Sequence, residues 1–232
     1  CDYLIISDGV FSKSKNLISN NKAQPKYNNT LALRGMITSS FKIDRKNISL
    51  FLGPNFHYVI YPVSPTGDLN FIAIMKYNLS LNEQKNYSLF SDESFIKEIL
   101  NNIPLEIKEF LDEIKELKIF PVFVSDNFFK TKNNNIQLIG DAFYAFPPSF
   151  AQGASQSLES AYELFKSIES DKESDFFKNR AVKTKMVNKR SKFNQFAFHL
   201  SNPLTRFFRN IFLKRLVKNK KFLESYLGKI YR

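Results

Sequence analysis

The chain has 232 residues, of which 43% are hydrophobic and 24% charged, and its formal net charge at pH 7 is +12. This composition is sufficient to bury a core and excludes a wholly disordered chain. One cysteine excludes an internal disulfide, no apolar run reaches about 18 residues, and no Cys/His spacing indicates a metal, so we expect a metal-free protein of the reducing cytoplasm.

The first predicted element is a strand over residues 2–7, which runs into the pair Asp8-Gly9. Its apolar run is typical of a buried strand, whereas Asp-Gly by itself predicts only a tight turn. Further strands are predicted at residues 30–38, 48–52, 57–63 and 69–76. In the last of these Phe71, Ala73 and Met75 alternate with more polar positions. This alternation predicts an antiparallel sheet.

Two helical patterns follow, introduced by Ser91 and Pro104. The second predicts one apolar face made of Leu105, Ile107, Phe110, Leu111, Ile114 and Leu117. The chain is then expected to return to the sheet at residues 120–124 and to form a polar turn at residues 130–135.

The segment from Ile136 to Ala154 combines a short strand, a carboxylate, two prolines and the start of a helix. Gly140 allows a sharp turn, after which Asp141 is expected to face a pocket at the carboxyl end of the strand. A helix is predicted from about Gln152, with an apolar face formed by Leu158, Ala161, Leu164, Phe165 and Ile168. The amides of its first turn have no partner within the helix. They favour an anion or a ring carbonyl.

The positive charge is concentrated in the last quarter of the chain. Residues 178–232 hold sixteen Lys or Arg and one acid, a net charge of +15, which leaves −3 for the first 177 residues. Within residues 202–222 one helical face carries Leu204, Phe207, Phe208, Ile211, Phe212, Leu216 and Val217. This face predicts either a helix packed on the protein or an interfacial helix that contacts anionic lipid. Nucleic-acid binding is a weaker alternative, because no recognised nucleic-acid module accompanies the charge.

Residues 140–161 read GDAFYAFPPSFAQGASQSLESA. They resemble the pattern GDAAHxxxPxxGQGxNxxxEDA of the flavoprotein aromatic hydroxylases, the group A monooxygenases that include salicylate and hydroxynicotinate hydroxylases. Four residues depart from this pattern, namely Tyr144, Ala151, Ser155 and Ser160, which replace a histidine, a glycine, an asparagine and an aspartate.

Further segments resemble the same family in the family's own order. Residues 3–12 resemble its D-L-L-I-G-A-D-G-x-x-S motif, and residues 52–63 with 70–73 resemble the hairpin that roofs the substrate pocket. Leu33-Arg34-Gly35 resembles a strand near the flavin, and residues 209–213 resemble a helical stretch close to the family's carboxyl end.

The resemblance implies FAD as the cofactor and assigns residues to it. Asp8 and Gly9 would lie beside the pyrophosphate, Asp141 would bond the ribityl chain, and the backbone of residues 151–154 would face the flavin pyrimidine. The cofactor-binding candidates are Asp8, Gly9, Arg34, Gly140, Asp141, Ala151, Gln152, Gly153 and Ala154. The substrate-pocket candidates are His57, Tyr61, Tyr144 and Pro148. No side chain is identified as a general base, and ordinary structural roles for His57, Arg34 and the tyrosines stay open.

The fold class expected is α+β, within a protein that is α/β when intact. Residues 1–25 are expected to be a remnant of a Rossmann-like FAD-binding domain, and residues 26–125 a substrate-binding antiparallel sheet with helices. Residues 126–170 would supply the second flavin motif, and residues 171–232 a basic helical tail. No G-x-G-x-x-G turn occurs among the seven glycines. We therefore expect the carboxyl-terminal part of a longer protein.

The activity implied is hydroxylation of a small aromatic substrate, with NADH or NADPH and O2, through a flavin C4a-hydroperoxide. The departures at Tyr144 and Ala151 leave a related epoxidase, halogenase or reductase as alternatives. Two further alternatives are a hydroxylase of quinone precursors that is peripheral at the inner membrane surface, and a non-enzymatic basic adaptor.

Overall fold

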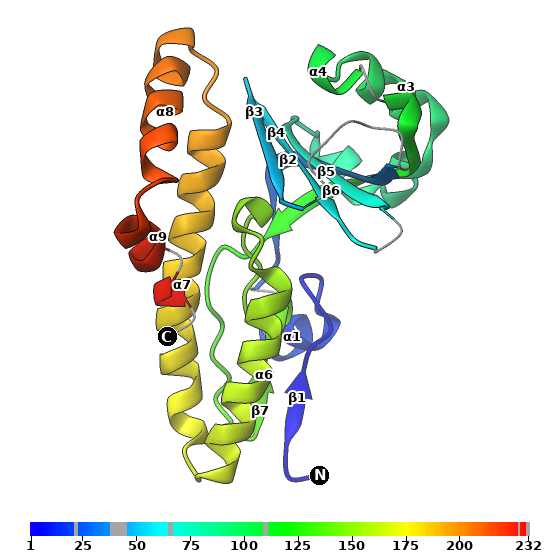
Figure 1. Ribbon diagram of the computed structural model, residues 1–232. Helices are drawn as coiled ribbons and strands as arrows, with labels where there is room; N and C mark the ends of the chain where they lie inside the picture. Colours follow the sequence, from blue (N-terminus) through cyan, green and yellow to red (C-terminus); the bar gives the residue numbers. More distant parts are fainter. Residues whose placement is uncertain (21–22, 38–45, 65–66, 109–110, 227, 231–232) are drawn as a thin grey trace. The chain divides into compact units, whose positions relative to one another are not determined.

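The computed structural model describes residues 1–20, 23–37, 46–64, 67–108, 111–226 and 228–230. The chain divides into two compact units. The helical unit comprises residues 1–28, 123–197 and 203–232, and the sheet unit comprises residues 29–122 and 198–202. Figure 1 shows the elements of both units.

The helical unit is built on two short parallel strands. Strand β1 (Leu4–Ile6) pairs with β7 (Ile136–Leu138), so residues 132 positions apart in the chain lie side by side. The helices are α1 (Lys13–Ile18), α5 (Gly140–Phe143), α6 (Gly153–Glu169), α7 (Glu173–Phe198), α8 (Pro203–Leu216) and α9 (Lys220–Tyr226), with short 3-10 turns η3 (Pro148–Phe150) and η4 (Gly228–Ile230). The prediction of a mainly helical chain after Gln152 is confirmed.

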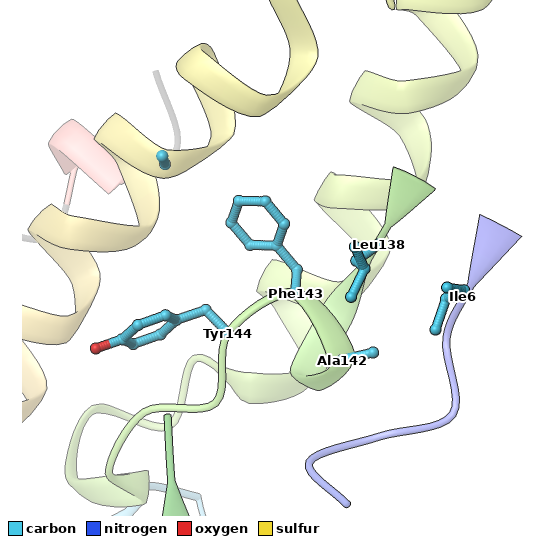
Figure 2. Packing of buried hydrophobic residues seen from close by; sticks show 6 residues of the cluster. Ile6, Leu138, Ala142, Phe143 and Tyr144 are labelled. Carbon is cyan, nitrogen blue, oxygen red and sulfur yellow. The ribbon is translucent and has the colours of Figure 1, made fainter. Parts of the chain in front are cut away.

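The core of this unit gathers where β7 turns into α5. Its buried members are Ile6, Leu138, Ala142, Phe143, Tyr144 and Ala181, and Figure 2 shows how they lie around the turn. Phe128 stacks on Tyr144 with 4.4 Å between ring centroids and meets Phe143 edge to face. Burial of these rings fixes the position of α5, and with it the start of the segment that connects β7 to α6.

Helices α6 and α7 are joined by a buried arginine. Arg180 of α7 is 2% exposed and donates to the main-chain and side-chain oxygens of Gln156 at 2.6 and 2.7 Å. Its guanidinium also pairs with Glu159 at 3.5 Å and Glu163 at 3.2 Å. Lys183 forms a second ion pair with Glu159. Four oxygens from three residues of α6 therefore surround one cation of α7.

The sheet unit contains five strands in the order β3-β4-β5-β2-β6. They are β2 (Lys26–Ile37), β3 (Ser49–Gly53), β4 (Phe56–Pro62), β5 (Leu69–Lys76) and β6 (Ile114–Val124). The pairs β2–β5, β3–β4 and β4–β5 are antiparallel, as the alternation predicted. The connecting segments are α2 (Leu81–Lys85), η1 (Tyr87–Ser91), α3 (Glu93–Asn101), α4 (Leu105–Lys108) and η2 (Leu111–Glu113).

The register gives the sheet two distinct faces. Directly paired residues in an antiparallel sheet project to the same side, and the side alternates along each strand. One face is apolar and buried, with Leu31, Leu33, Ile37, Ile60, Leu69, Phe71 and Ala73. The other, which we call the Arg34 face, carries Ala32, Arg34, Met36, His57, Val59, Tyr61, Asn70, Ile72 and Ile74.

The helix predicted after Pro104 is wrong beyond its first turn. Helix α4 ends at Lys108, and Ile114 and Leu117 belong to β6. Pairing beside β2 outweighs the helical spacing of these residues, because a strand buries Ile114 against the sheet while a surface helix would not. Phe110 and residue 38, the end of the predicted second strand, lie outside the described residues.

Two predicted helical faces also differ from the structure. Helix α6 forms as expected, but Leu158 and Phe165 are 75% and 57% exposed, while Gln156, Ser160 and Leu164 are buried. The Arg180 network turns the polar side of α6 inward. In α8 the apolar face is exposed, and the buried residue is Arg209. The prediction that this face packs on the protein is therefore wrong for the described part of the chain.

Candidate functional site

The turn after β7 requires glycine for two reasons. Gly140 has φ +58°, a conformation that side-chain-bearing residues rarely adopt, and a Cβ there would lie 2.9 Å from the Ser157 hydroxyl. The Gly140 amide donates to the Ser160 hydroxyl at 3.1 Å. The turn is therefore pressed against α6, and it places Asp141 close to the amino end of that helix.

The amino end of α6 presents free backbone donors. Gln152 occupies the N-cap position, and its side chain accepts no hydrogen bond from the backbone amides of the helix. In the described chain the amides of Gly153, Ala154 and Ser155 have no partner. A Cβ on Gly153 would meet no atom within 4 Å, and Gly153, Ala154 and Ser155 are exposed, so the first turn of the helix is open to solvent. Free amides at the positive end of a 17-residue helix form an anion-binding or carbonyl-binding surface.

Ala151 stands where the resembling pattern has glycine, and it keeps the backbone that a glycine would adopt. Its φ and ψ are 51° and 35°, in the left-handed region. Its amide donates to the Pro148 carbonyl at 2.9 Å, which closes the turn before α6. The substitution therefore preserves the path of the chain at a cost of about 1 kcal/mol in backbone strain.

A buried lysine lies between the two aspartates of the predicted motifs. After the turn at Gly9, where φ is +82°, Ser12 caps α1 by accepting from the Lys15 amide at 2.9 Å. Asp8 accepts from the Ser14 amide at 3.2 Å. Lys15 is 3% exposed and interacts electrostatically with both Asp8 and Asp141. The structure thus brings the two motifs together around one cation.

The electrostatics of this group follow from burial and close partners. Burial lowers the pKa of Lys15, and the two carboxylates oppose that shift. Burial of the carboxyl group raises the pKa of Asp141, against the influence of Lys15, although the residue as a whole is exposed. Burial also opposes ionisation of Asp8, but hydrogen bonds from Ser12 and Ser14 outweigh it and lower its pKa.

Sequence reasoning did not select Lys15. A lysine in a short basic segment is usually solvated, and nothing in the residues around it indicates burial. The available signal is its position on the first turn of α1, three residues after the capping Ser12. That spacing points its side chain back toward the Asp8 turn.

In the sheet unit, Arg34, His57 and Tyr61 lie on the Arg34 face. His57 is 3% exposed, and its Nδ1 lies 2.9 Å from Nε2 of His199. The His199 carbonyl also accepts from the Asn55 amide at 3.3 Å. Tyr61 is half-buried and pairs across the sheet with Asn70. His57 is therefore held by a second histidine that the sequence did not connect to it.

The Arg34 face also bears an open hollow of about 270 Å³. Its lining residues are Arg34, Gly35, Met36, Asn70, Glu116, Lys118 and Phe120. Arg34 was selected from the sequence. Asn70 lies in a strand that the sequence predicted without giving this residue a role. Glu116 and Lys118 were not selected, because the first part of β6 was predicted to be helical.

The remaining candidates lie in the helical unit. Tyr144 is 4% exposed, and its hydroxyl accepts from the Asn188 amide at 3.0 Å, so core packing accounts for it (Figure 2). Pro148 is exposed at the start of η3. Gln152 is buried, and its side-chain oxygen accepts from Gln156 at 3.3 Å.

Comparison with known proteins gives a family and a fold. The family model of squalene epoxidase matches residues 2–221. No curated protein matches the sequence.

Solved structures of other proteins have the same fold, one of them with FAD bound. Klebsiella pneumoniae HpxO complexed with FAD and uric acid has a TM-score of 0.76 at 15% identity, over 99% of this chain and 60% of that one. A salicylate hydroxylase substrate complex has a TM-score of 0.67 at 20% identity, over 93% of this chain and 60% of that one. The tetracycline destructase Tet(51) has a TM-score of 0.68 at 13% identity, over 92% of this chain and 60% of that one. The chain thus spans about 60% of the length of these structures.

Because Ala151 has a left-handed backbone, replacement by glycine should affect stability in opposite directions at Ala151 and at Ala161. Ala151→Gly relieves the left-handed strain and should raise the free energy of unfolding by roughly 0.5–1 kcal/mol. The matched change Ala161→Gly, at an exposed position inside α6, should lower it by about 1 kcal/mol. Urea denaturation measures both. Destabilisation by both changes would contradict the backbone assigned to Ala151.

The histidine pair predicts loss of stability in acid. Burial lowers the pKa of His57 to about 3 and that of His199 to about 4, with a further contribution from His199 to the former and from Lys76 to the latter. At pH values between these folded-state pKa values and 6.5, the unfolded chain therefore binds more protons than the folded chain. Stability is complete above pH 6.5 and falls below it, by up to about 1.4 kcal/mol per pH unit for each proton.

Urea unfolding at pH 7.5, 6.0 and 5.0 tests this dependence. The double change His57→Gln with His199→Gln should flatten the slope, because glutamine keeps a hydrogen bond without titrating. An identical slope in the two proteins would rule out the pair as its source.

Proposed function

We propose that this chain, which belongs to the squalene epoxidase family, holds the flavin ring and the substrate in an FAD-dependent monooxygenase. It has the fold of flavoproteins solved with FAD, uric acid or a substrate. Because the chain spans about 60% of those structures, the activity of the whole protein is inferred from its site.

The observation that carries the proposal is the free amino end of α6 beside the turn at Gly140. The open amides of Gly153 and Ala154 suit a carbonyl of the flavin that gains negative charge on reduction. Asp141 offers an acceptor for the hydroxyls of a ribityl chain. Lys15, buried between two aspartates, supplies a cation of the kind that phosphate groups require. These residues fit FAD without a reactive side chain, because the cofactor supplies the redox chemistry.

The proposed reaction consumes O2 and a reduced nicotinamide, NADH or NADPH. One oxygen atom enters the substrate, the other leaves as water, and the nicotinamide is oxidised. When bound, FAD supplies the electron transfer and the activation of O2. The protein's tasks are to hold the reacting carbon in place, stabilise negative charge on the ring and exclude water.

An aromatic substrate is the first choice, since uric acid and salicylate hydroxylase occur among the similar structures. Epoxidation of an alkene is the second, and the family match favours it over halogenation or reduction.

The strands β1 and β7 support a larger flavin-binding domain. Leu4 and Ile5 are 49% and 47% exposed, although a parallel sheet is normally buried on both faces. On α6, Leu158 and Phe165 are likewise exposed. We propose that residues outside this sequence extend this sheet, cover these side chains and bind the ADP half of FAD.

An acidic residue introduced at the start of α6 should weaken flavin binding without destabilising the fold. Ala154→Asp should stabilise the helix by up to about 0.5 kcal/mol through the helix dipole, while its carboxylate repels the flavin carbonyl. In the full-length protein we expect roughly tenfold less bound FAD, measured by absorbance at 450 nm after purification and by titration with FAD. The control variant Ala161→Asp, two turns further along α6, should bind as much FAD as the wild-type protein. Normal FAD binding by the first variant, or wild-type protein that binds no FAD, would refute the proposal.

A membrane-surface role is the second candidate, and the exposure of α8 favours it. Leu204, Phe207, Phe208 and Phe212 are 59–66% exposed on a helix that also bears Arg206, Lys214 and Arg215. Arg209 turns inward and donates to the Ala197 carbonyl at 3.3 Å. In the described part of the chain no helix is long and apolar enough to cross a membrane. Aromatic side chains among cations suit a helix that lies on an anionic bilayer, with residues 202–222 as the contact. Cytoplasmic location at the inner membrane surface is part of this proposal.

Flotation with vesicles tests the membrane contact. Full-length protein should bind vesicles with 30% phosphatidylserine more tightly than neutral vesicles, and salt should weaken the binding. Lys214→Glu with Arg215→Glu should reduce it by at least about tenfold, at about 1 kcal/mol per charge. Replacing Phe207, Phe208 and Phe212 by serine should also reduce it.

The matched control replaces Leu81, Tyr87 and Leu105 of the sheet unit, which are equally exposed, by serine. Equal loss in the control, or none in the α8 variants, would show that α8 does not bind lipid. Salt-sensitive binding to nucleic acid without binding to vesicles would favour the basic adaptor instead.

A further inference from the structure

The turn η3 leads directly into the free amides of α6, and helix α7 holds it by a main-chain carbonyl. Asn194 of α7 donates from Nδ2 to the carbonyl of Ser149 at 3.3 Å. In the described part of the chain, no other element donates a hydrogen bond to η3. The Ser149 hydroxyl has no partner among the described residues, although the residue is buried. The polar hold on η3 therefore comes from Asn194.

Tyr226, the last residue of α9, fixes the orientation of the Asn194 amide. A carbonyl only accepts, so Nδ2 of Asn194 faces Ser149 and its Oδ1 is left for a donor. The Tyr226 hydroxyl donates to this Oδ1 at 2.9 Å. Burial raises the pKa of Tyr226, against the influence of Arg190, so the hydroxyl keeps its proton at neutral pH. Two hydrogen bonds thus run in series from Tyr226 through Asn194 to the turn.

The ring of Tyr226 reaches the same turn by a second route. It meets the Phe150 ring edge to face, with 5.7 Å between the ring centroids. Phe150 ends η3 and precedes Ala151, whose left-handed backbone directs the chain into α6. Edge-to-face packing adds a directional contact to the apolar burial of both rings. Tyr226 therefore contacts the turn through its ring and, by way of Asn194, through its hydroxyl.

Arg190 of α7 fastens α9 in place. Its guanidinium donates to the main-chain carbonyl of Tyr226 and, at 3.5 Å, to that of Ser225. It also lies over the Tyr226 ring, 4.9 Å from the centroid. Carbonyls at the end of a helix have no partner within it, so a cation is favourable there. Phe222 stacks on Tyr226 at 5.2 Å between centroids, and Figure 1 shows α9 beside α7. These contacts give Tyr226 a defined position from which to hold η3.

We infer that Tyr226 and Asn194 are positioning residues, which set where the free amides of α6 stand. Only two residues separate η3 from α6, so a shift of η3 is passed on to the amides of Gly153 and Ala154. Each side chain acts through the main chain rather than by touching the bound group. The inference deepens the proposed function and rests on it for the identity of that group, a flavin carbonyl that gains negative charge on reduction.

Hydrogen exchange tests the hold on η3 without requiring a cofactor. The Ala151 amide donates to the Pro148 carbonyl at 2.9 Å, and it is released when the turn opens. In the full-length protein, Tyr226→Phe keeps the ring but removes the hydroxyl, and it should speed exchange of this amide about threefold. Asn194→Ala should speed the exchange about tenfold. The amide of Leu164, further along α6, should exchange at its original rate, which would show that the opening is local.

The midpoint potential of bound FAD tests the position of the amides. Displaced amides stabilise the reduced, anionic flavin less, whereas a loss of protein stability alone would lower the amount of flavin bound and leave its potential unchanged. Asn194→Ala should lower the affinity for reduced relative to oxidised FAD about tenfold, which makes the potential about 30 mV more negative. Tyr226→Phe should lower this ratio about threefold.

The matched control removes a tyrosine hydroxyl from the sheet unit. Tyr77→Phe loses the hydrogen bond that Tyr77 donates to Glu98 at 3.1 Å. This change should alter neither the potential of bound FAD nor the exchange of the Ala151 amide.

A double variant tests whether the two residues act in series. Once Asn194→Ala has removed the link to Ser149, adding Tyr226→Phe should have no further effect on exchange or potential. Fully additive effects would mean that the Tyr226 hydroxyl acts elsewhere, and would overturn the series.

The outcomes distinguish this inference from the proposed function. If neither change speeds exchange at Ala151, or if neither moves the potential of bound FAD, the inference is overturned while FAD binding keeps the monooxygenase. Faster exchange in both variants of a full-length protein that takes up no FAD would keep the hold on η3 and refute the monooxygenase.

Discussion

The ion pair network of Arg180 is the interaction on which the helical unit depends. A guanidinium that is 2% exposed has given up its hydration, so it is stable only with the oxygens of Gln156, Glu159 and Glu163 around it. Breaking such a buried pair typically costs about 3–5 kcal/mol. The network fixes how α6 is rotated, and this rotation directs Ser157 and Ser160 at Gly140. The free amides and Asp141 therefore keep their relation to each other because a charge of α7 is buried against the first turns of α6.

Each of the two units offers its own kind of binding group to the proposed function. In the helical unit the groups proposed to bind the flavin are mainly backbone amides, together with Lys15, which interacts with two aspartates. In the sheet unit the groups are side chains of the Arg34 face, including an amide and two cations. Backbone donors suit a cofactor that is common to many relatives, because they do not depend on residue identity. Side chains on a sheet suit the substrate, because each can change without altering the strands.

The departures from the family pattern change residues while the geometry stays. Ala151 keeps the left-handed backbone of the glycine it replaces, and Gly140 and Gly153 keep the turn and the open space. Tyr144, in place of histidine, joins the aromatic core through Phe128 and Asn188. The family model matches the chain even though these positions differ, since what the flavin motif specifies is the path of the main chain.

The sequence by itself determined four of the five strands of the sheet, the Gly140 turn and the start of α6, because period-two alternation and glycine act over a few neighbouring residues. It also identified the flavin motifs. Only the tertiary structure decided that Ile114 and Leu117 lie in a strand, that α6 buries its polar side, and that Lys15 and Asn70 are buried. These outcomes depend on partners at least 17 residues away, namely β2, Arg180, Asp141 and β6, and local spacing carries no information about such contacts.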